Sequence, residues 1–383
     1  YQKQTGKAGD FAFDNMLPGL YKIFPYKNDD PTLGVSTSDL IAIQKHILGI
    51  ERFERMDQFV AGDVNKDDDI TSIDLIELRK LILGIYTQFP QNTSWRFFDK
   101  TLMARTTDHL AMAEFENPYI EAVEKQKSEQ NFTGIKIGDV NQSAAPQLDN
   151  LQSRNRSAQE VTIPDVLVKA GNLVEVPFSL DITGLYGLQA SIEFKGMQIV
   201  GINYNQDLIG KTSSINDRMF EKGIINISWI KPYTDVRSGS QRLISIYLRP
   251  KENGKLSEFI NFKNTGLTAE AYSQDRTVYD LIFKFLPAEA HQGSNLSRAI
   301  VMQNSPNPFT YSTMISYTLP AAGKVRWSVT DMTGRLIQVW ENALDKGDYQ
   351  VTLDKNQLKS SGIYYYKLEY NGYAEVRKMI LLE

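Results

Sequence analysis

Residues 62–84 have the sequence Gly62-Asp63-Val64-Asn65-Lys66-Asp67-Asp68-Asp69-Ile70-Thr71-Ser72-Ile73-Asp74, followed directly by Leu75-Ile76-Glu77-Leu78-Arg79-Lys80-Leu81-Ile82-Leu83-Gly84. Oxygen-bearing side chains stand at loop positions 1, 3 and 5, and a carboxylate stands at position 12. This spacing suits a loop around a hard cation, because alternate side chains turn inward, position 7 offers its backbone carbonyl and position 12 closes the shell. We predict a Ca²⁺ site formed by Asp63, Asn65, Asp67, Asp69 and Asp74.

Asp68 stands where calcium loops of this kind have Gly, at a sharp turn that requires a left-handed backbone. An Asp adopts that conformation less readily than Gly. The alternative to a metal site is a solvated acidic turn whose Asp or Ser side chain caps the following helix.

An internal repeat extends the pattern, because residues 39–50 align with residues 74–85. Apolar residues at helical spacing, Lys in the last turns and a Gly stop predict two helices. The same alignment and a third fragment, residues 138–143, supply weaker candidate metal ligands: Asn28, Asp30, Thr32, Asp39, Asp139 and Asn141. Pro31 interrupts the first loop, and the third fragment is a half-loop without a helix that cannot close a shell alone.

Composition excludes several function classes. The length of 383 residues predicts more than one domain. A net charge of -4 and a pI near 5.6 mean that the chain offers no basic field for nucleic acid or anionic membranes. It has no Cys, which excludes disulfides, thiolate metal sites and a thiol nucleophile. No apolar run reaches the length of a membrane span. Tyr1 opens no signal peptide, so we expect this chain to be the C-terminal part of a longer protein.

Most of the rest of the chain shows the alternation of apolar and polar residues that is typical of β-strands. We predict strands at 161–168, 173–182, 187–194, 199–204, 223–230, 243–250 and 277–285, and in the tail at 314–319, 324–331, 336–341, 349–353, 363–370 and 373–382. Asn371-Gly372 predicts a type I′ hairpin turn. Residues 146–160 and 288–302 are predicted linkers. Residues 1–27 are predicted to be one end of a β-sandwich.

Several stretches resemble known families. The paired loops and helices, with Phe132-Thr133-Gly134-Ile135-Lys136-Ile137-Gly138-Asp139-Val140-Asn141, resemble a type I dockerin over residues 28–145, with an insertion at 101–130. Stretches such as Gly187-Leu188-Gln189-Ala190-Ser191-Ile192-Glu193-Phe194 resemble a cohesin over residues 161–287. Residues 1–27 resemble the C-terminal end of a carboxypeptidase-regulatory-like sandwich.

The tail, residues 303–383, resembles the type A C-terminal sorting domain of Bacteroidetes type IX secretion. The resemblance rests on Pro306-Asn307-Pro308-Phe309, Asp331-Met332-Thr333-Gly334-Arg335, Ser361-Gly362-Ile363-Tyr364-Tyr365 and Lys378-Met379-Ile380. It implies passage through the type IX machinery and a place at the outer-membrane surface. In that family the domain is usually cleaved when cargo is attached to lipopolysaccharide.

Signs of catalysis are weak. The chain has only His46, His109 and His291. His46 takes a helix position held by Leu81 in the other repeat, so a packed His is the simpler interpretation. Trp229 and Tyr233 suggest a sugar-stacking platform, although strand alternation favours core or edge packing.

We therefore expect a multi-domain, mainly β chain of Ig- or cohesin-like sandwiches with a small calcium-binding α unit, and no enzyme. The expected function is a calcium-rigidified structural, adhesion or appendage segment of a secreted surface protein. The alternatives are the accessory and export end of a hydrolase whose catalytic domain lies upstream, and a carbohydrate-binding module. We also expect the dockerin-like and cohesin-like units to contact each other through the exposed helix faces, within one chain or between neighbours, with homo-oligomers as an open alternative.

Overall fold

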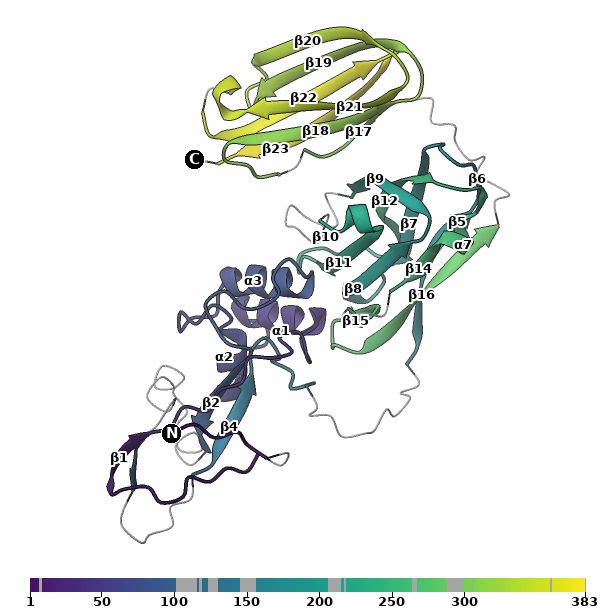
Figure 1. Ribbon diagram of the computed structural model, residues 1–383. Coiled ribbons are helices and arrows are strands. Elements are labelled where there is room, and N and C mark those ends of the chain that lie inside the picture. The colour runs from purple at the N-terminus through teal and green to yellow at the C-terminus, as the bar shows by residue number, and fades with distance from the viewer. Residues whose placement is uncertain are drawn as a thin grey trace.

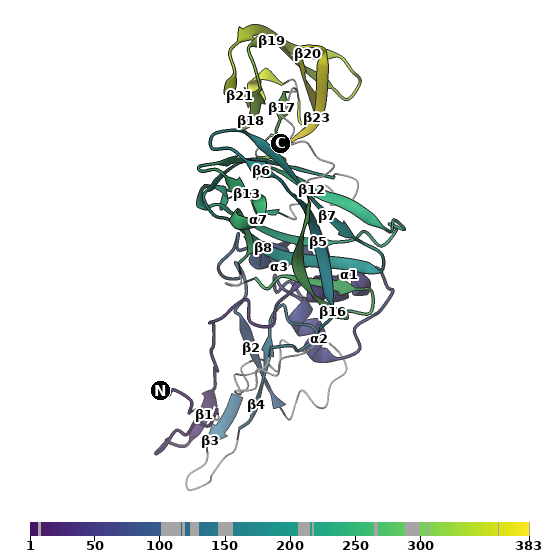
Figure 2. The same ribbon diagram turned by 90° about the vertical axis from the view of Figure 1, so that its right-hand side faces the viewer.

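A computed structural model describes residues 1–6, 9–100, 116, 119–122, 130–144, 156–205, 215–216, 218–263, 267–287, 299–304, 306–358 and 360–382. Figures 1 and 2 show the parts of the molecule in a row: an N-terminal ribbon, a helical unit, a central β-sandwich and a C-terminal β domain. The predicted mainly β class is confirmed, and the longer helices are gathered in one small unit.

The N-terminal region contributes the strand β1 (Gly19–Lys22). It pairs antiparallel with β3 (Tyr119–Ala122), which belongs to the predicted insertion. Most of the insertion lies outside the described residues. The partner of β1 therefore comes from the insertion and not from residues 1–27. This pairing does not test whether residues 1–27 are the end of a larger β-sandwich, and that assignment stays a prediction.

The helical unit contains α1 (Thr37–Ile47), α2 (Met56–Gly62) and α3 (Ser72–Ile82), with an antiparallel pair of strands, β2 (Trp95–Asp99) and β4 (Phe132–Lys136). The sequence repeat predicted α1 and α3 but not α2. Both repeats and β4 contribute to one apolar core, which includes Leu40, Ile43, Leu78, Ile82 and Ile135.

The central sandwich is one 10-stranded sheet folded over on itself, with the order β10-β11-β8-β15-β16-β5-β7-β12-β9 and β14 paired to β8. Its strands are β5 (Ala158–Asp165), β7 (Val174–Asp181), β8 (Leu185–Phe194), β9 (Met197–Tyr204), β10 (Ile215–Asn216), β11 (Ile224–Ile230), β12 (Ser240–Pro250), β14 (Ile260–Phe262), β15 (Glu270–Ser273) and β16 (Val278–Pro287). A short pair, β6 (Leu167–Val168) with β13 (Gly254–Lys255), and the helices η2 (Phe220–Lys222) and α7 (Leu256–Phe259) complete it.

Side chains from both halves of the folded sheet share the sandwich core. Trp229 on β11, Phe178 on β7 and Ile246 on β12 are all almost fully buried there. A parallel pairing of β16 with β5, which aligns Asp280 with Ala158, connects the two halves. Strand β5 thus begins inside the predicted 146–160 linker, because its pairing with β16 reaches further than the alternation pattern indicated.

The C-terminal domain packs two sheets, β17-β18-β21 and β20-β19-β22-β23, against each other. The strands are β17 (Ile300–Val301), β18 (Ser312–Leu319), β19 (Gly323–Asp331), β20 (Leu336–Leu344), β21 (Gly347–Asp354), β22 (Gly362–Tyr370) and β23 (Tyr373–Leu381), with a short helix η3 (Lys355–Gln357). The predicted hairpin is confirmed: Asn371 and Gly372 both have positive φ, at 46° and 79°, and Tyr370 faces Tyr373.

The second predicted linker, 288–302, is too long at its C-terminal end. Residues 288–298 lie outside the described part, but Ile300–Val301 forms β17 and pairs with β18. Val301 enters the core of the C-terminal domain, whereas Ile300 and Met302 pack against Tyr247 of the sandwich. Successive residues of this short strand therefore face two different domains. A stretch of three or four apolar residues is too short for the sequence to indicate this arrangement.

Candidate metal centre and helix–sandwich interface

The two repeats of the helical unit begin their helices in the same way. Ser36 caps α1 and Thr71 caps α3, and each forms a capping box with an Asp three residues later, Asp39 or Asp74. The helices end as predicted, just before Gly49 and Gly84, which have left-handed φ values of 69° and 71°. The last residue of each predicted calcium loop is thus also a cap of the following helix.

Residues 63–74 form a closed loop held by carboxylate and amide oxygens. Asp63 Oδ1 accepts a hydrogen bond from the Asp67 amide at 3.0 Å, and Asp63 Oδ2 accepts one from the Asp68 amide at 3.3 Å. Asn65 Oδ1 accepts from the Asp67 amide at 3.1 Å. Asp68 has φ 68°, the left-handed conformation that the Gly position of such loops requires.

Asp74 joins the two ends of this loop. Its Oδ1 accepts from the amides of Val64 at 2.8 Å and Asn65 at 3.2 Å, while its Oδ2 accepts from the Thr71 amide at 2.8 Å. The side chain is fully buried. Position 12 therefore fixes the start of α3 against the start of the loop.

Burial and a neighbouring guanidinium set the charge of the loop. Burial raises the pKa of Asp63 to about 6, against the opposing effects of the Asp67 amide and the Arg96 guanidinium. Burial also raises the pKa of Asp74. Arg96 Nη1 lies 3.7 Å from Asp63 Oδ2, and the same guanidinium forms a second ion pair with Glu116, at 3.1 Å. Arg96 thus neutralises part of the charge that a bound cation would share.

The donor set fits a hard, oxygen-seeking ion rather than a transition metal. Within the described ranges, no three His, Cys, Asp or Glu side chains converge as a metal-binding group. A cation here would therefore need the Asn65 amide oxygen, the Asp69 carbonyl and water alongside the carboxylates, as calcium loops use. Asp67, Asp68 and Asp69 are exposed, so this side of the loop is open to solvent.

The weaker candidates divide into two groups. Asn28 Oδ1 accepts a hydrogen bond from the Ser94 amide at 2.8 Å, and Asp30 and Thr32 are exposed. Asp39 instead meets the third fragment, because its Oδ1 accepts from the Asn141 amide at 3.3 Å. The structure therefore brings Asp39 together with residues 139–141, and not with residues 28–32.

The first turn of α1 lies directly on the sandwich, against β8 and β11, as Figures 1 and 2 show. The Thr37 amide donates to Gln189 Oε1 at 2.7 Å, and the Thr37 hydroxyl pairs with the Ser228 hydroxyl at 2.8 Å. Thr37 and Ser228 are fully buried. Gly187 allows this approach, since a Cβ there would stand 3.1 Å from both Ile41 Cδ1 and Thr37 Cγ2.

The C-terminal ends of both helices also contact the sandwich. Leu83 O, just after α3, accepts hydrogen bonds from the side-chain amides of Asn216 and Asn226, each at 3.0 Å. Lys45, near the end of α1, donates to Gln274 O at 2.8 Å. The last carbonyls of a helix have no amide donor within the helix. The Leu83 carbonyl instead accepts its hydrogen bonds from two side chains of the sandwich.

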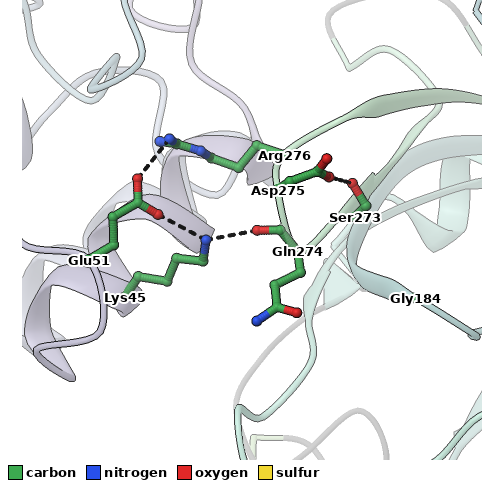
Figure 3. A pocket seen from close by; sticks show the side chains of 7 residues that line it. All are labelled: Lys45, Glu51, Gly184, Ser273, Gln274, Asp275 and Arg276. Carbon is green, nitrogen blue, oxygen red and sulfur yellow. Dashed lines mark hydrogen bonds and ion pairs between the residues drawn. The ribbon is translucent and has the colours of Figure 1, made fainter.

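An open hollow beside Lys45 shows the charged side of this interface (Figure 3). Lys45 Nζ lies 2.9 Å from Glu51 Oε2, and Arg276 of the β15–β16 turn lies 2.9 Å from Glu51 Oε1. The hydrogen bond from Lys45, with the charge of Arg276, holds the pKa of Glu51 below its ordinary value. Glu51 therefore links a helix of one unit to a turn of the other.

The structure also bears on the roles considered for the histidines and for Trp229 and Tyr233. His46 is half-buried, stacks on Phe53 at 4.4 Å and accepts the Phe53 amide on Nδ1, as the packed interpretation predicts. Trp229 is 1% exposed, so the sugar-stacking hypothesis is wrong for this residue because its ring faces the sandwich core. Tyr233 is 40% exposed and packs beside Tyr186. His109 and His291 lie outside the described residues.

Sequence reasoning missed the polar residues that complete the loop and the interface: Arg96, Glu116, Gln189, Asn216, Asn226 and Ser228. Each meets its partner across a long stretch of chain, and Gln189 lies in a strand whose alternation indicates only a sheet. No local pattern marks such residues. The two units are in contact within one chain, which is one of the two expected arrangements, and the contact uses the helix ends and the first turn of α1 rather than whole exposed faces.

Solved structures similar to this chain include cohesins. The seventh type I cohesin of the scaffoldin ScaB from Pseudobacteroides cellulosolvens is 11% identical, covering 36% of this chain and 97% of that chain, with a TM-score of 0.27. A type I cohesin–dockerin complex from Clostridium thermocellum is 14% identical, covering 34% and 99%, with a TM-score of 0.27. Dimeric latent PorU from Porphyromonas gingivalis is 15% identical, covering 61% and 19%, with a TM-score of 0.22. The similarity is low in both measures.

The C-terminal domain has a family assignment of its own. Residues 305–382 match the model of the secretion system C-terminal sorting domain, so the chain carries a type IX sorting domain. This domain implies export by the type IX machinery and attachment at the surface. No curated protein matches the chain. No helix in the described residues is long and apolar enough to cross a membrane.

Proposed function

We propose that residues 28–287 form a self-docked, non-catalytic joint in an exported surface protein. In this proposal the helical unit is a dockerin-like module bound by the cohesin-like sandwich of its own chain. The observation that carries it is the seating of α1 on β8 and β11, where the fully buried Thr37 makes both of its polar contacts with the sandwich.

Several features support a rigid joint. Contacts occur at the first turn of α1, at its last turn and just after α3, so rotation about any one of them would break the others. Buried polar pairs add specificity, because a misaligned docking that still excluded water would leave donors and acceptors unpaired. The C-terminal domain continues the row, since Arg249 of the sandwich pairs with Asp348 at 2.7 Å.

Calcium is the proposed stabiliser of this joint. The bound ion would be held by Asp63, Asn65, Asp67, Asp69 and Asp74. Its charge would compensate for burial, which disfavours the charged form of the Asp63 and Asp74 carboxylates. Extracellular sites of this type have Kd of about 0.1–1 mM. At about 10 mM calcium, mass action would then stabilise the folded unit by about 1.4–2.7 kcal/mol.

Calcium titration of the intact chain by calorimetry tests this proposal. Asp63→Ala should remove the heat of one binding site, because it deletes the position-1 ligand. Asp345→Ala, an exposed Asp in the C-terminal domain, is the matched control and should leave the titration unchanged. Identical heats for the wild type and Asp63→Ala would refute the metal role of the loop.

A further inference from the structure

The first residues of the C-terminal domain are fixed to that domain by their backbone and by alternate side chains. β17 pairs with β18, and the Met302 amide donates to Ser316 O at 2.8 Å. The side chains of Ala299 and Val301 are fully buried in the core of the same domain. Residues 299–302 are therefore part of the sorting domain and not the end of a linker.

A buried tyrosine holds this segment in place. The hydroxyl of Tyr366, which is fully buried, donates to Met302 O at 2.8 Å and accepts a hydrogen bond from the Asn304 amide at 2.9 Å. The side-chain amide of Asn304 donates to Thr313 Oγ1 at 2.9 Å. The position of residues 302–304 is thus set by the core of the sorting domain.

The remaining side chains of the segment face the sandwich. Ile300 and Met302 pack against Tyr247 on the outer face of β12. Gly201 of β9 allows this approach, since a Cβ there would overlap the Met302 sulfur. Tyr247 is only 3% exposed, although it lies outside the sandwich core. An aromatic ring on the outer face of a sheet is buried here because the sorting domain covers it.

Two polar contacts flank this apolar centre. Arg249 of β12 donates two hydrogen bonds to Asp348, from Nη1 to Oδ2 at 2.7 Å and from Nη2 to Oδ1 at 3.1 Å. Arg377 of β23 donates from Nη1 to Asn203 Oδ1 on β9 at 3.0 Å. The paired geometry of the first contact adds directional specificity to its charge. An apolar centre with a polar rim is the usual composition of a protein–protein interface.

The peptide link between the two domains supplies none of these contacts. The sandwich residues that take part lie between positions 201 and 249, and those of the sorting domain lie between positions 300 and 377. Each set is attached to a separate core. Figures 1 and 2 show the sandwich between the helical unit and the sorting domain, so the two contacts of the sandwich use different faces.

We propose that the outer face of β9 and β12 is a docking site for the sorting domain of the same chain, and that the two stay bound when the link at 288–298 is cut. The partner is defined by its chemistry: the apolar side chains of Ile300 and Met302 with the Asp348 carboxylate and the Arg377 guanidinium beside them. A protease that cuts the link therefore does not by itself detach the sorting domain. This docking needs neither calcium nor the helical unit, so it stands apart from the proposed joint.

Sedimentation of a cut chain tests this docking. A specific protease site is inserted within residues 288–298 of the intact chain, which is cleaved under native conditions and followed through a dilution series. The wild-type fragments should sediment together and separate only on dilution. Arg249→Asp and Asp348→Arg should each weaken the association by about 2- to 10-fold, because each places like charges opposite one another. The double variant restores an opposite-charge pair and should bind as the wild type does.

The matched control is Lys324→Glu, which reverses the charge of a side chain that is 75% exposed and pairs with Glu341 inside the sorting domain. It should leave the association unchanged. Restoration in the double variant separates a lost contact from misfolding, and Asp348→Arg, at a side chain 45% exposed, tests the contact alone if Arg249→Asp does not fold. Wild-type fragments that separate at every concentration would overturn the proposal. So would reversals that leave the association unchanged or a double variant that does not restore it.

Discussion

Replacing Gln189 by Met should loosen the helical unit from the sandwich while leaving both cores intact. Gln189 is 3% exposed, and its Oε1 accepts the Thr37 amide at 2.7 Å. Met keeps the length of the side chain but offers no comparable acceptor. Thr37 is the first residue of α1, so its amide has no acceptor within the helix.

The expected magnitude follows from the burial of that amide. Leaving a buried donor unpaired costs about 1–3 kcal/mol. In Gln189→Met the Thr37 amide is unpaired only in the docked state, because water hydrates it when the units separate. The whole cost therefore falls on docking and corresponds to a weakening of about 5- to 150-fold.

The assay uses a chain with a specific protease site inserted between residues 146 and 155. After cleavage, the concentration at which the two fragments separate is measured by sedimentation for the wild type, Gln189→Met and the control Gln198→Met, whose side chain is exposed on β9. Exchange of the Thr37 amide in the uncut chain is a second measure. The reasoning is wrong if Gln189→Met fragments stay together to the same dilution as wild-type fragments.

Three further predictions concern charge, turn conformation and the outer domain contact. Lys45, in the same unit as Glu51, is the larger cause of the lowered pKa of Glu51, and Arg276, across the interface, adds to it. Only the Arg276 pair stabilises docking; its contribution is present above pH 4.5, the ordinary pKa of Glu51, and is lost as pH falls through the lower value in the folded chain. Cleaved fragments should therefore separate somewhat more readily on acidification, and Glu51→Gln should flatten this part of the pH dependence; an unchanged dependence would contradict the role of the pair. Gly372→Ala places a Cβ on a backbone with φ 79°, which costs about 1–2 kcal/mol and should lower the melting temperature of the sorting domain by a few degrees. The control Gly347→Ala should leave the melting temperature unchanged, because a Cβ there has no atom nearer than 3.6 Å. Equal melting of the two variants would contradict the turn assignment. A Cβ at residue 201 would overlap the Met302 sulfur, so Gly201→Val should speed hydrogen exchange in β17, and Gly201→Val with Met302→Ala should restore protection; unchanged exchange would show that this contact does not hold the tail.

Local signals predicted much of the fold. The two helices, most strands of the sandwich and the Asn371-Gly372 hairpin follow from periodicity and turn chemistry, which act over a few neighbouring residues. The contiguous loop is of the same kind, since its ligand positions lie within residues 63–74. By contrast, α2 lacks a strong period over its short length, and β1 pairs with a strand from an insertion.

The chain by itself determined which pieces exist: a loop of oxygen-bearing side chains, two capped helices, alternating strands and the motifs of a sorting domain. Only the tertiary structure decided which pieces meet. It joined Asp39 to Asn141 rather than to residues 28–32, and it placed Thr37 on Gln189. The physical reason is that ligand spacing is encoded locally, whereas the meeting of distant segments is set by the packing of the shared core, to which Val35, Leu78 and Val140 all contribute.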